Sequence, residues 1–262
     1  MLRIGPICRY AEDLPIILKV IVSDDKLESL QLNKSTDLKT LRVFYMNGIS
    51  NCFVEPLGSE CSNALKLAVE HFERKYDICA IRVDLPLVHN ALDFYFTSMN
   101  VPGEPAMTDM DCAMEFIKLL FGKSEHMFAT ISQALIENHP MYSEDRKRMI
   151  MADRDRLRRE VCDLLQDDGI LLFPSFPTLA PFHNQPLLTP FNFLYTAIWN
   201  TLTLPVLQCP LGLSTDDPSN RLPTGVQVVG SPLSDHLLMA VAQDLEEAFG
   251  GWAVPQSVVV NE

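Results

Sequence analysis

Residue types that commonly carry out catalysis or bind metals occur in this sequence, but they are scattered. The six histidines lie far apart, and the chain contains no H-E-x-x-H, G-x-S-x-G or glycine-rich phosphate loop. The carboxylate pairs Asp109/Asp111 and Asp167/Asp168 suit helix ends and solvated turns better than acid–base catalysis. Ser175 could act as a nucleophile only with a base beside it. We therefore expect no metal, no cofactor and no complete catalytic site within this chain.

An aromatic cluster is the group whose residue types and spacing most favour ligand binding. It consists of Phe191, Phe193, Tyr195 and Trp199. On a helix, Tyr195 and Trp199 are four residues apart and share one face. Two interpretations remain open at this point. The cluster is either ordinary core packing, the more common role of such residues, or the wall of a channel for an apolar ligand.

The aromatic cluster lies within residues 170–232, the most apolar part of the chain. This stretch predicts a short buried strand, a proline-rich loop, one helix, a second buried strand, a turn and a third strand. Buried strands without polar alternation are typical of a sheet that is covered on both faces and mostly parallel. Residues 214–222, between the last two strands, are polar, so we expect an exposed turn there.

The segments that precede and follow this stretch must complete the sheet. Residues 41–46, 59–76 and 78–83 predict a strand, a helix and a strand, which together form a β-α-β unit. No repeat or linker is evident, so we expect a single domain over residues 1–262. Apolar residues at helical spacing predict further helices at 89–99, 110–121, 124–138, 143–166 and 234–249.

The start of the chain predicts a helix followed by a loop. Pro6 can occupy the first turn of a helix, and Arg9 and Asp13 would pair along it at a spacing of four residues. Residues 23–40 are polar and predict a loop.

Charge and cysteine content narrow the class of protein. The net charge of −13 and the pI near 4.8 disfavour nucleic acid or an anionic membrane surface as the main partner. The seven cysteines are odd in number and irregularly spaced, which favours reduced thiols and a cytosol-facing protein. No apolar run approaches the ~20 residues that a membrane-spanning helix needs.

Short segments in a fixed order also carry a resemblance to a known family. They are 5–14 (GPICRYAEDL), 190–193 (PFNF) with 195–196 (YT), 208–213 (QCPLGL), 223–230 (PTGVQVVG), 235–237 (DHL) and 249–252 (FGGW). Together they resemble the amidase signature family and, within it, the animal fatty-acid amide hydrolase 2 group. Residues 23–140 resemble the family only loosely.

The resemblance implies both a fold and a reaction. The fold is α/β, with a central mixed sheet of many strands covered by helices on both faces. The reaction is amide hydrolysis by a serine nucleophile, a second serine in a cis peptide and a lysine base. In family order this triad precedes the segment that begins at Gly5, and the chain contains no G-G-S or S-x-G-S cluster. We therefore expect the triad to lie in an N-terminal half that is missing from this chain.

Only the substrate pocket carries over from the family to this sequence. Phe193, Tyr195, Thr196 and Trp199 match the helix that lines the family's acyl channel, which makes them the substrate-channel candidates. Thr203 stands where many family members have glycine. The resemblance suggests a small-molecule lipid amide as ligand, a homodimer, and membrane contact only through the N-terminal region.

The sequence thus predicts the C-terminal part of a fatty-acid amide hydrolase-like serine amidase, inactive on its own. A non-catalytic module for lipid binding or dimerisation, related to amidases, is the alternative.

Overall fold

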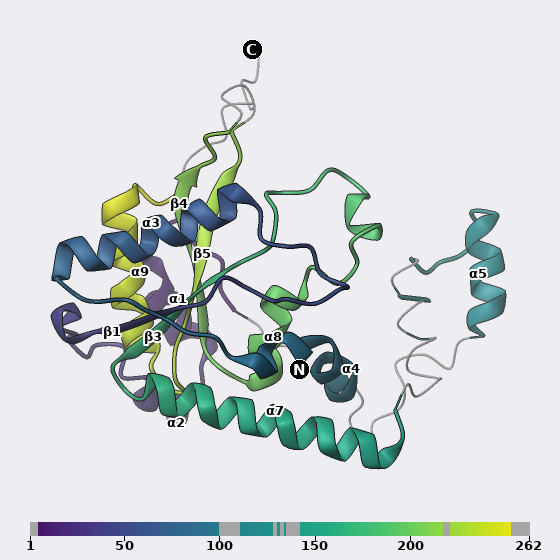
Figure 1. Cartoon of the computed structure of the whole chain (residues 1–262), viewed down its shortest axis with the longest axis horizontal. Helices are drawn as coiled ribbons and strands as arrows, with labels where there is room; N and C mark the ends of the chain where they lie inside the picture. Colours follow the sequence, from purple (N-terminus) through teal and green to yellow (C-terminus); the bar gives the residue numbers. More distant parts are fainter. Residues whose placement is uncertain are drawn as a thin grey trace.

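The computed structural model describes residues 5–99, 111–127, 130–131, 134, 142–216 and 221–252 (Figure 1). Its sheet has five strands in the order β2-β1-β3-β5-β4. The strands are β1 (Arg42–Tyr45), β2 (Ile81–Arg82), β3 (Gly169–Pro174), β4 (Val206–Leu213) and β5 (Pro223–Val229). The α-helices are α1 (Asp13–Ile21), α2 (Asp24–Leu27), α3 (Ser59–Tyr76), α4 (Ala91–Met99), α5 (Cys112–Leu120), α7 (Glu144–Leu165), α8 (Leu194–Leu202) and α9 (Asp235–Phe249). Short 3-10 helices are η1 (Glu28–Leu30), η2 (Leu38–Thr40), η3 (Pro86–Asn90) and η4 (Gln185–Leu187).

The sheet is mixed, as the family resemblance implies, and less parallel than its apolar strands suggest. β1 pairs in parallel with β2 and β3, whereas β5 pairs antiparallel with β3 and β4. The antiparallel pairing of β4 with β5 follows from connection length, because residues 214–222 join these two strands directly. A connection that short can join only antiparallel neighbours, whereas parallel strands need a long crossover.

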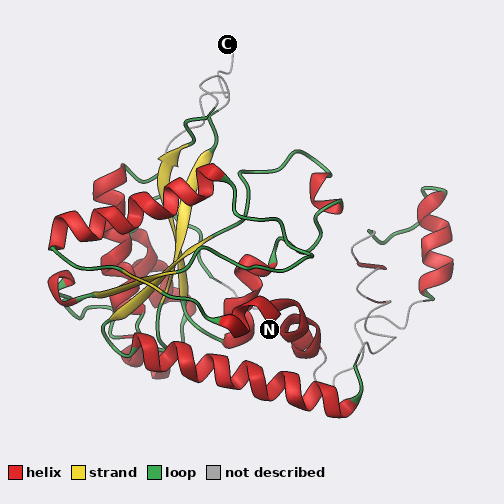
Figure 2. Cartoon of the chain, in the orientation of Figure 1, coloured by secondary structure: helices red, strands yellow, loops and turns green. Residues whose placement is uncertain are grey.

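Helices cover both faces of the sheet (Figure 2). α3 and α9 pack on one face, and α4, α7 and α8 on the other. Side chains alternate along β3, so Leu171 and Phe173 enter the core beneath α4, α7 and α8, while Ile170 and Leu172 enter the core beneath α3 and α9. All four are fully buried. Each such side chain stabilises the fold by roughly 1.5–3 kcal/mol.

The predicted β-α-β unit is confirmed. α3 spans the predicted range 59–76 and connects the parallel strands β1 and β2. Ala64, Ala68 and Phe72, one helical turn apart, form its buried face. β2 is shorter than the predicted range 78–83, because it lies at the edge of the sheet and pairs with only two residues of β1.

The first helix begins later than predicted, at Asp13 rather than at Pro6. The segment before it is held by Glu246 of α9 and by Trp252 instead. Arg9 stacks over the ring of Trp252 at 4.3 Å, and the backbone N–H of Ala11 donates to Glu246 at 3.0 Å. The predicted pair of Arg9 with Asp13 does not form, because the guanidinium lies against Trp252.

The predicted loop at residues 23–40 contains helices, and the predicted helix at residues 124–138 is described only in part. Residues 23–40, predicted as a loop, contain α2, η1 and η2; a local cap supports η2, where Asp37 accepts from the N–H of Lys39. Most of the predicted helix 124–138 lies outside the described residues. Among the described helices, none combines the length and the apolar character needed to cross a membrane.

A buried carboxylate fastens α3 to α9. Asp244 of α9 is 5% exposed and accepts hydrogen bonds from three side chains of α3. His71 Nε2 lies 2.6 Å and Lys75 Nζ 2.5 Å from its oxygens, and Tyr76 supplies the third bond through its hydroxyl. A buried charge needs such partners, because desolvation would otherwise destabilise it strongly.

Candidate functional site

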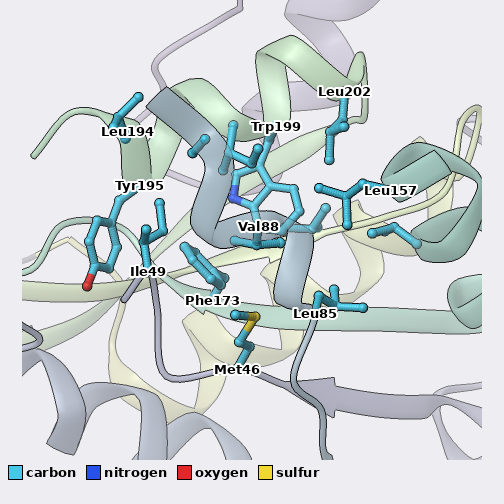
Figure 3. Packing of buried hydrophobic residues seen from close by; sticks show 14 of the residues in the cluster. Met46, Ile49, Leu85, Val88, Leu157, Phe173, Leu194, Tyr195, Trp199 and Leu202 are labelled. Carbon is cyan, nitrogen blue, oxygen red and sulfur yellow. The ribbon is translucent and has the colours of Figure 1, made fainter. Parts of the chain in front are cut away.

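The four channel candidates lie on or beside α8. They form two groups that differ in how far the side chains are buried. Tyr195 and Trp199 are each 1% exposed, whereas Phe193 is half-buried and Thr196 is exposed. The expected common face of Tyr195 and Trp199 is therefore confirmed. It packs on Phe173 of β3, with ring centroids 5.7 Å and 5.0 Å away, respectively (Figure 3). These two rings belong to the core, the interpretation that residue type alone favours.

The other two aromatic residues of the sequence cluster join a separate group of rings. The ring centroid of Phe193 lies 4.7 Å from that of Tyr95 of α4, and the ring centroid of Phe191 lies 6.2 Å from that of Phe96 of α4. Phe53, which is 57% exposed, meets Phe191 at 5.8 Å. We call these five residues the aromatic wall. Edge-to-face ring contacts of this kind hold such a group together.

The sequence analysis did not identify three members of the aromatic wall, Phe53, Tyr95 and Phe96. Consecutive residues of a helix point in different directions, so the three rings of the run Phe94-Tyr95-Phe96 have different surroundings. Phe94 is indeed 1% exposed, whereas its two neighbours are only half-buried. This run of three aromatic residues was the sequence signal that could have identified Tyr95 and Phe96.

A buried amide holds α8 in register with the sheet. Gln227 of β5 is 4% exposed, and its Nε2 donates to the carbonyl oxygens of Pro174 at 2.9 Å and Tyr195 at 3.0 Å. One side chain thus connects the end of β3, the middle of β5 and the start of α8. Because a buried amide needs its partners, this contact fixes where α8 presents Phe193 and Thr196.

The turn that ends α8 explains the family preference for glycine at position 203. Thr203 has φ of +54°, in the left-handed region that glycine adopts without strain. Arg158 of α7 compensates in part. Its Nε donates to the carbonyl of Leu202 at 3.0 Å and to Oγ1 of Thr203 at 3.2 Å.

A groove of about 1340 Å³ runs along the outer edge of the sheet. Residues 5–10, the loop after β3, the end of α8 and the strand β4 line it. Ser175 at the end of β3 donates to the side chain of Gln208 on β4, and both border the groove. Within the described residues, β4 pairs with β5 on one side only, so its other edge faces this groove without a strand partner.

Three weakly acidic side chains near the groove and α8 have raised pKa values, which disfavour their ionised forms. Burial raises the pKa of the Tyr195 hydroxyl and of the Cys61 thiol, and it raises the pKa of Cys209 to about 12. All seven cysteines are free thiols, as the sequence predicts. Within the described ranges, no three His, Cys, Asp or Glu side chains are grouped so that they could hold a metal ion.

Known proteins resemble this chain in sequence and in fold. The family model described as Amidase matches residues 1–239. The chain is 39% identical to fatty-acid amide hydrolase 2-B of Danio rerio and 36% identical to fatty-acid amide hydrolase 2 of Homo sapiens, over 96% of its own length and 49% of theirs. A solved structure of fatty acid amide hydrolase superposes with a TM-score of 0.66 at 20% identity, covering 94% of this chain and 48% of that one.

The chain thus spans about half the length of the curated relatives that it matches. The mixed sheet covered by helices is the fold of the solved structure, and the family model covers nearly the whole sequence. The chain belongs to the amidase family.

Proposed function

We propose that this chain is the acyl-binding part of a fatty-acid amide hydrolase-like serine amidase. In this proposal the aromatic wall and the exposed face of α8 contact the acyl chain of a fatty acid amide. The serine nucleophile, the second serine and the lysine base come from the half of the amidase domain that the match with the relatives does not span. The chain alone is then inactive, because no group among the described residues is placed to activate a nucleophile.

The aromatic wall is the observation that carries this proposal. A ring such as Phe53 left 57% exposed beside Phe191 has surface available for an apolar ligand. Together the wall offers flat apolar faces from α4, from the start of α8 and from the loop after β1. Such a surface suits an alkyl chain, which gains about 0.8 kcal/mol for each methylene that it buries.

The groove along β4 supports the second part of the proposal. Val206, at 36% exposure, and Ile7, which is fully exposed, are apolar residues in this groove. An open strand edge beside exposed apolar side chains is a surface that folded proteins normally cover. The remainder of an amidase domain, packed along β4, would cover it and would bring the catalytic groups next to the loop after β3.

A chimera tests the amidase activity directly. This chain would replace the matching half of the zebrafish relative, and hydrolysis of a long-chain fatty acyl amide would be measured by release of ammonia. We expect the chimera to hydrolyse the amide and the isolated chain not to do so. A chimera that folds, as judged by circular dichroism and gel filtration, but releases no ammonia contradicts the proposal.

Phe193 is the residue of the aromatic wall best suited to a binding test. Phe193→Ala should weaken the affinity for a long-chain acyl amide with a fluorophore at its polar end about tenfold, because truncation removes buried aromatic contact. Fluorescence titration of the isolated chain or of the chimera measures the change. Phe182→Ala is the matched control, since Phe182 is 80% exposed on the loop after β3. Equal effects of the two substitutions would refute a specific acyl site.

The alternative function, a lipid-binding module without catalysis, predicts a different combination of results. The isolated chain would bind the fluorescent amide through Phe193, while the folded chimera would show no hydrolysis.

A further inference from the structure

A second cavity, of about 650 Å³, lies where the parallel strands β1 and β2 end. The segments that follow the two strands line it: residues 46–51 with Val54, Pro56 and Leu57 after β1, and residues 82–84 at the end of β2. His89 of η3 and Tyr195 of α8 complete the lining. β1 lies between β2 and β3 in the sheet, so the strand order changes direction at β1. The cavity therefore lies at the carboxyl ends of parallel strands, beside a switch in strand order. Ligands of open α/β sheets bind at such positions.

The backbone around this cavity is held in place by hydrogen bonds. The N–H of Ser50 donates to Nδ1 of His89 at 3.0 Å, and the side-chain amide of Asn51 donates to the carbonyl of His89 at 3.0 Å. Gly48 has φ of +117°, and a Cβ there would lie 2.6 Å from the Tyr195 hydroxyl. The loop after β1 therefore approaches Tyr195 as closely as only glycine permits.

These contacts leave hydrogen-bond donors available on the cavity lining. Within the described residues, Arg82 makes no ion pair or hydrogen bond through its guanidinium, and it is exposed at the end of β2. The Tyr195 hydroxyl lies beside Gly48 on the cavity lining, and its O–H group can donate a hydrogen bond. His89 accepts at Nδ1, so its neutral ring carries the proton on Nε2.

One carboxylate opposes this set of donors. Asp84 lies 3.4 Å from Nε2 of His89 and is 76% exposed. Its negative charge lowers the attraction of the cavity for anions, although solvent screens an exposed charge of this kind. The charged side chains on the lining are therefore Arg82 and Asp84.

We propose that this cavity binds an oxyanion, a carboxylate or a phosphate group, through the Arg82 guanidinium and the Tyr195 hydroxyl. A guanidinium presents two parallel N–H donors that match the two oxygens of such a group. The oxyanion belongs either to a free small anion or to the acidic head group of an amphiphile. In the second case its apolar chain has the aromatic wall nearby, because Phe53 belongs to the same loop after β1 as Asn51 and Val54.

Calorimetric titration of the whole chain with acetate, inorganic phosphate and oleate tests the proposal. Arg82→Gln should weaken binding about tenfold, because it removes the charge and one of the two parallel donors. Asp84→Asn should tighten binding about threefold, because it removes the opposing charge at nearly constant shape. The two substitutions thus have opposite expected signs, which a general loss of folding cannot produce.

Arg74→Gln is the matched control, because Arg74 is 79% exposed on α3 and pairs only with Glu70 on the helix surface. Similar affinities for acetate, phosphate and oleate would identify a free small anion as the ligand. Binding of oleate alone would identify the head group of an amphiphile. The proposal is overturned if none of the three probes binds, or if Arg74→Gln weakens binding as much as Arg82→Gln.

Discussion

Trp199→Ala is expected to lower the free energy of unfolding by about 3–5 kcal/mol, the range typical of removing a buried aromatic side chain. Trp199 is 1% exposed and is among the largest fully buried side chains described. Its ring packs edge-to-face on Phe173 at 5.0 Å, so truncation would leave a cavity between α8 and the sheet. Urea denaturation, followed by far-UV circular dichroism, measures the loss.

Two control substitutions separate packing from other effects. Thr196→Ala, on the exposed face of the same helix, should change stability by less than about 0.5 kcal/mol. Trp199→Phe should cost much less than Trp199→Ala, because the indole N–H has no hydrogen-bond partner among the described residues and its removal leaves nothing unsatisfied. If Trp199→Ala changed stability as little as Thr196→Ala, this side chain would not belong to the core.

This result also bears on the channel candidates, because Tyr195 and Trp199 lie on one face of α8. A large loss of stability at Trp199 with a small loss at Phe193 would show that Trp199 is a packing residue and that Phe193 is not needed for the core. Weaker binding of the fluorescent amide by Phe193→Ala would then assign ligand contact to the aromatic wall.

The second large effect concerns the carboxylate that joins α3 to α9. Asp244→Asn should lower the free energy of unfolding by about 2–3 kcal/mol near neutral pH, because the buried carboxylate accepts from His71, Lys75 and Tyr76. The estimate lies below the full value of a buried ion pair, because the side chain of Lys75 is 42% exposed.

The pH dependence of this effect has a definite sign. Burial by itself would raise the pKa of Asp244, but hydrogen bonds from Lys75, Tyr76 and His71 outweigh it and hold the pKa below its usual value. The unfolded carboxyl titrates near pH 3.9, so the stabilisation is fully present above about pH 4 and disappears as the pH falls through the lower pKa of the folded state.

Urea denaturation of the wild type and of Asp244→Asn at about pH 7 and about pH 3 measures this window. The difference between the two proteins should shrink at the lower pH. Glu247→Gln is the control for a simple change of net charge, since Glu247 is exposed on the same helix. A difference that stayed constant with pH would show that the Asp244 charge does not contribute to stability.

The sequence by itself determined those features that depend on local periodicity. α3 occupies the predicted range, because its apolar residues recur at helical spacing on one face. The strands β3, β4 and β5 lie where uninterrupted apolar runs and a polar turn predict them, although β4, predicted to be buried, exposes Val206, Gln208 and Pro210. The common face of Tyr195 and Trp199 also follows from spacing alone. Each of these features involves residues that are close together in the chain.

Only the tertiary structure decided which surface each aromatic residue contacts. Phe193 packs at the margin of the core against Tyr95 of α4, whereas Trp199 turns toward Phe173 of β3. The late start of α1 has the same kind of cause, because Arg9 stacks on Trp252, which follows α9. Such contacts join residues far apart in the sequence, and neither propensity nor periodicity carries information about them. The polar cavity that Arg82 and Tyr195 line is likewise a product of the fold, because an edge strand and a helix from distant parts of the chain meet there.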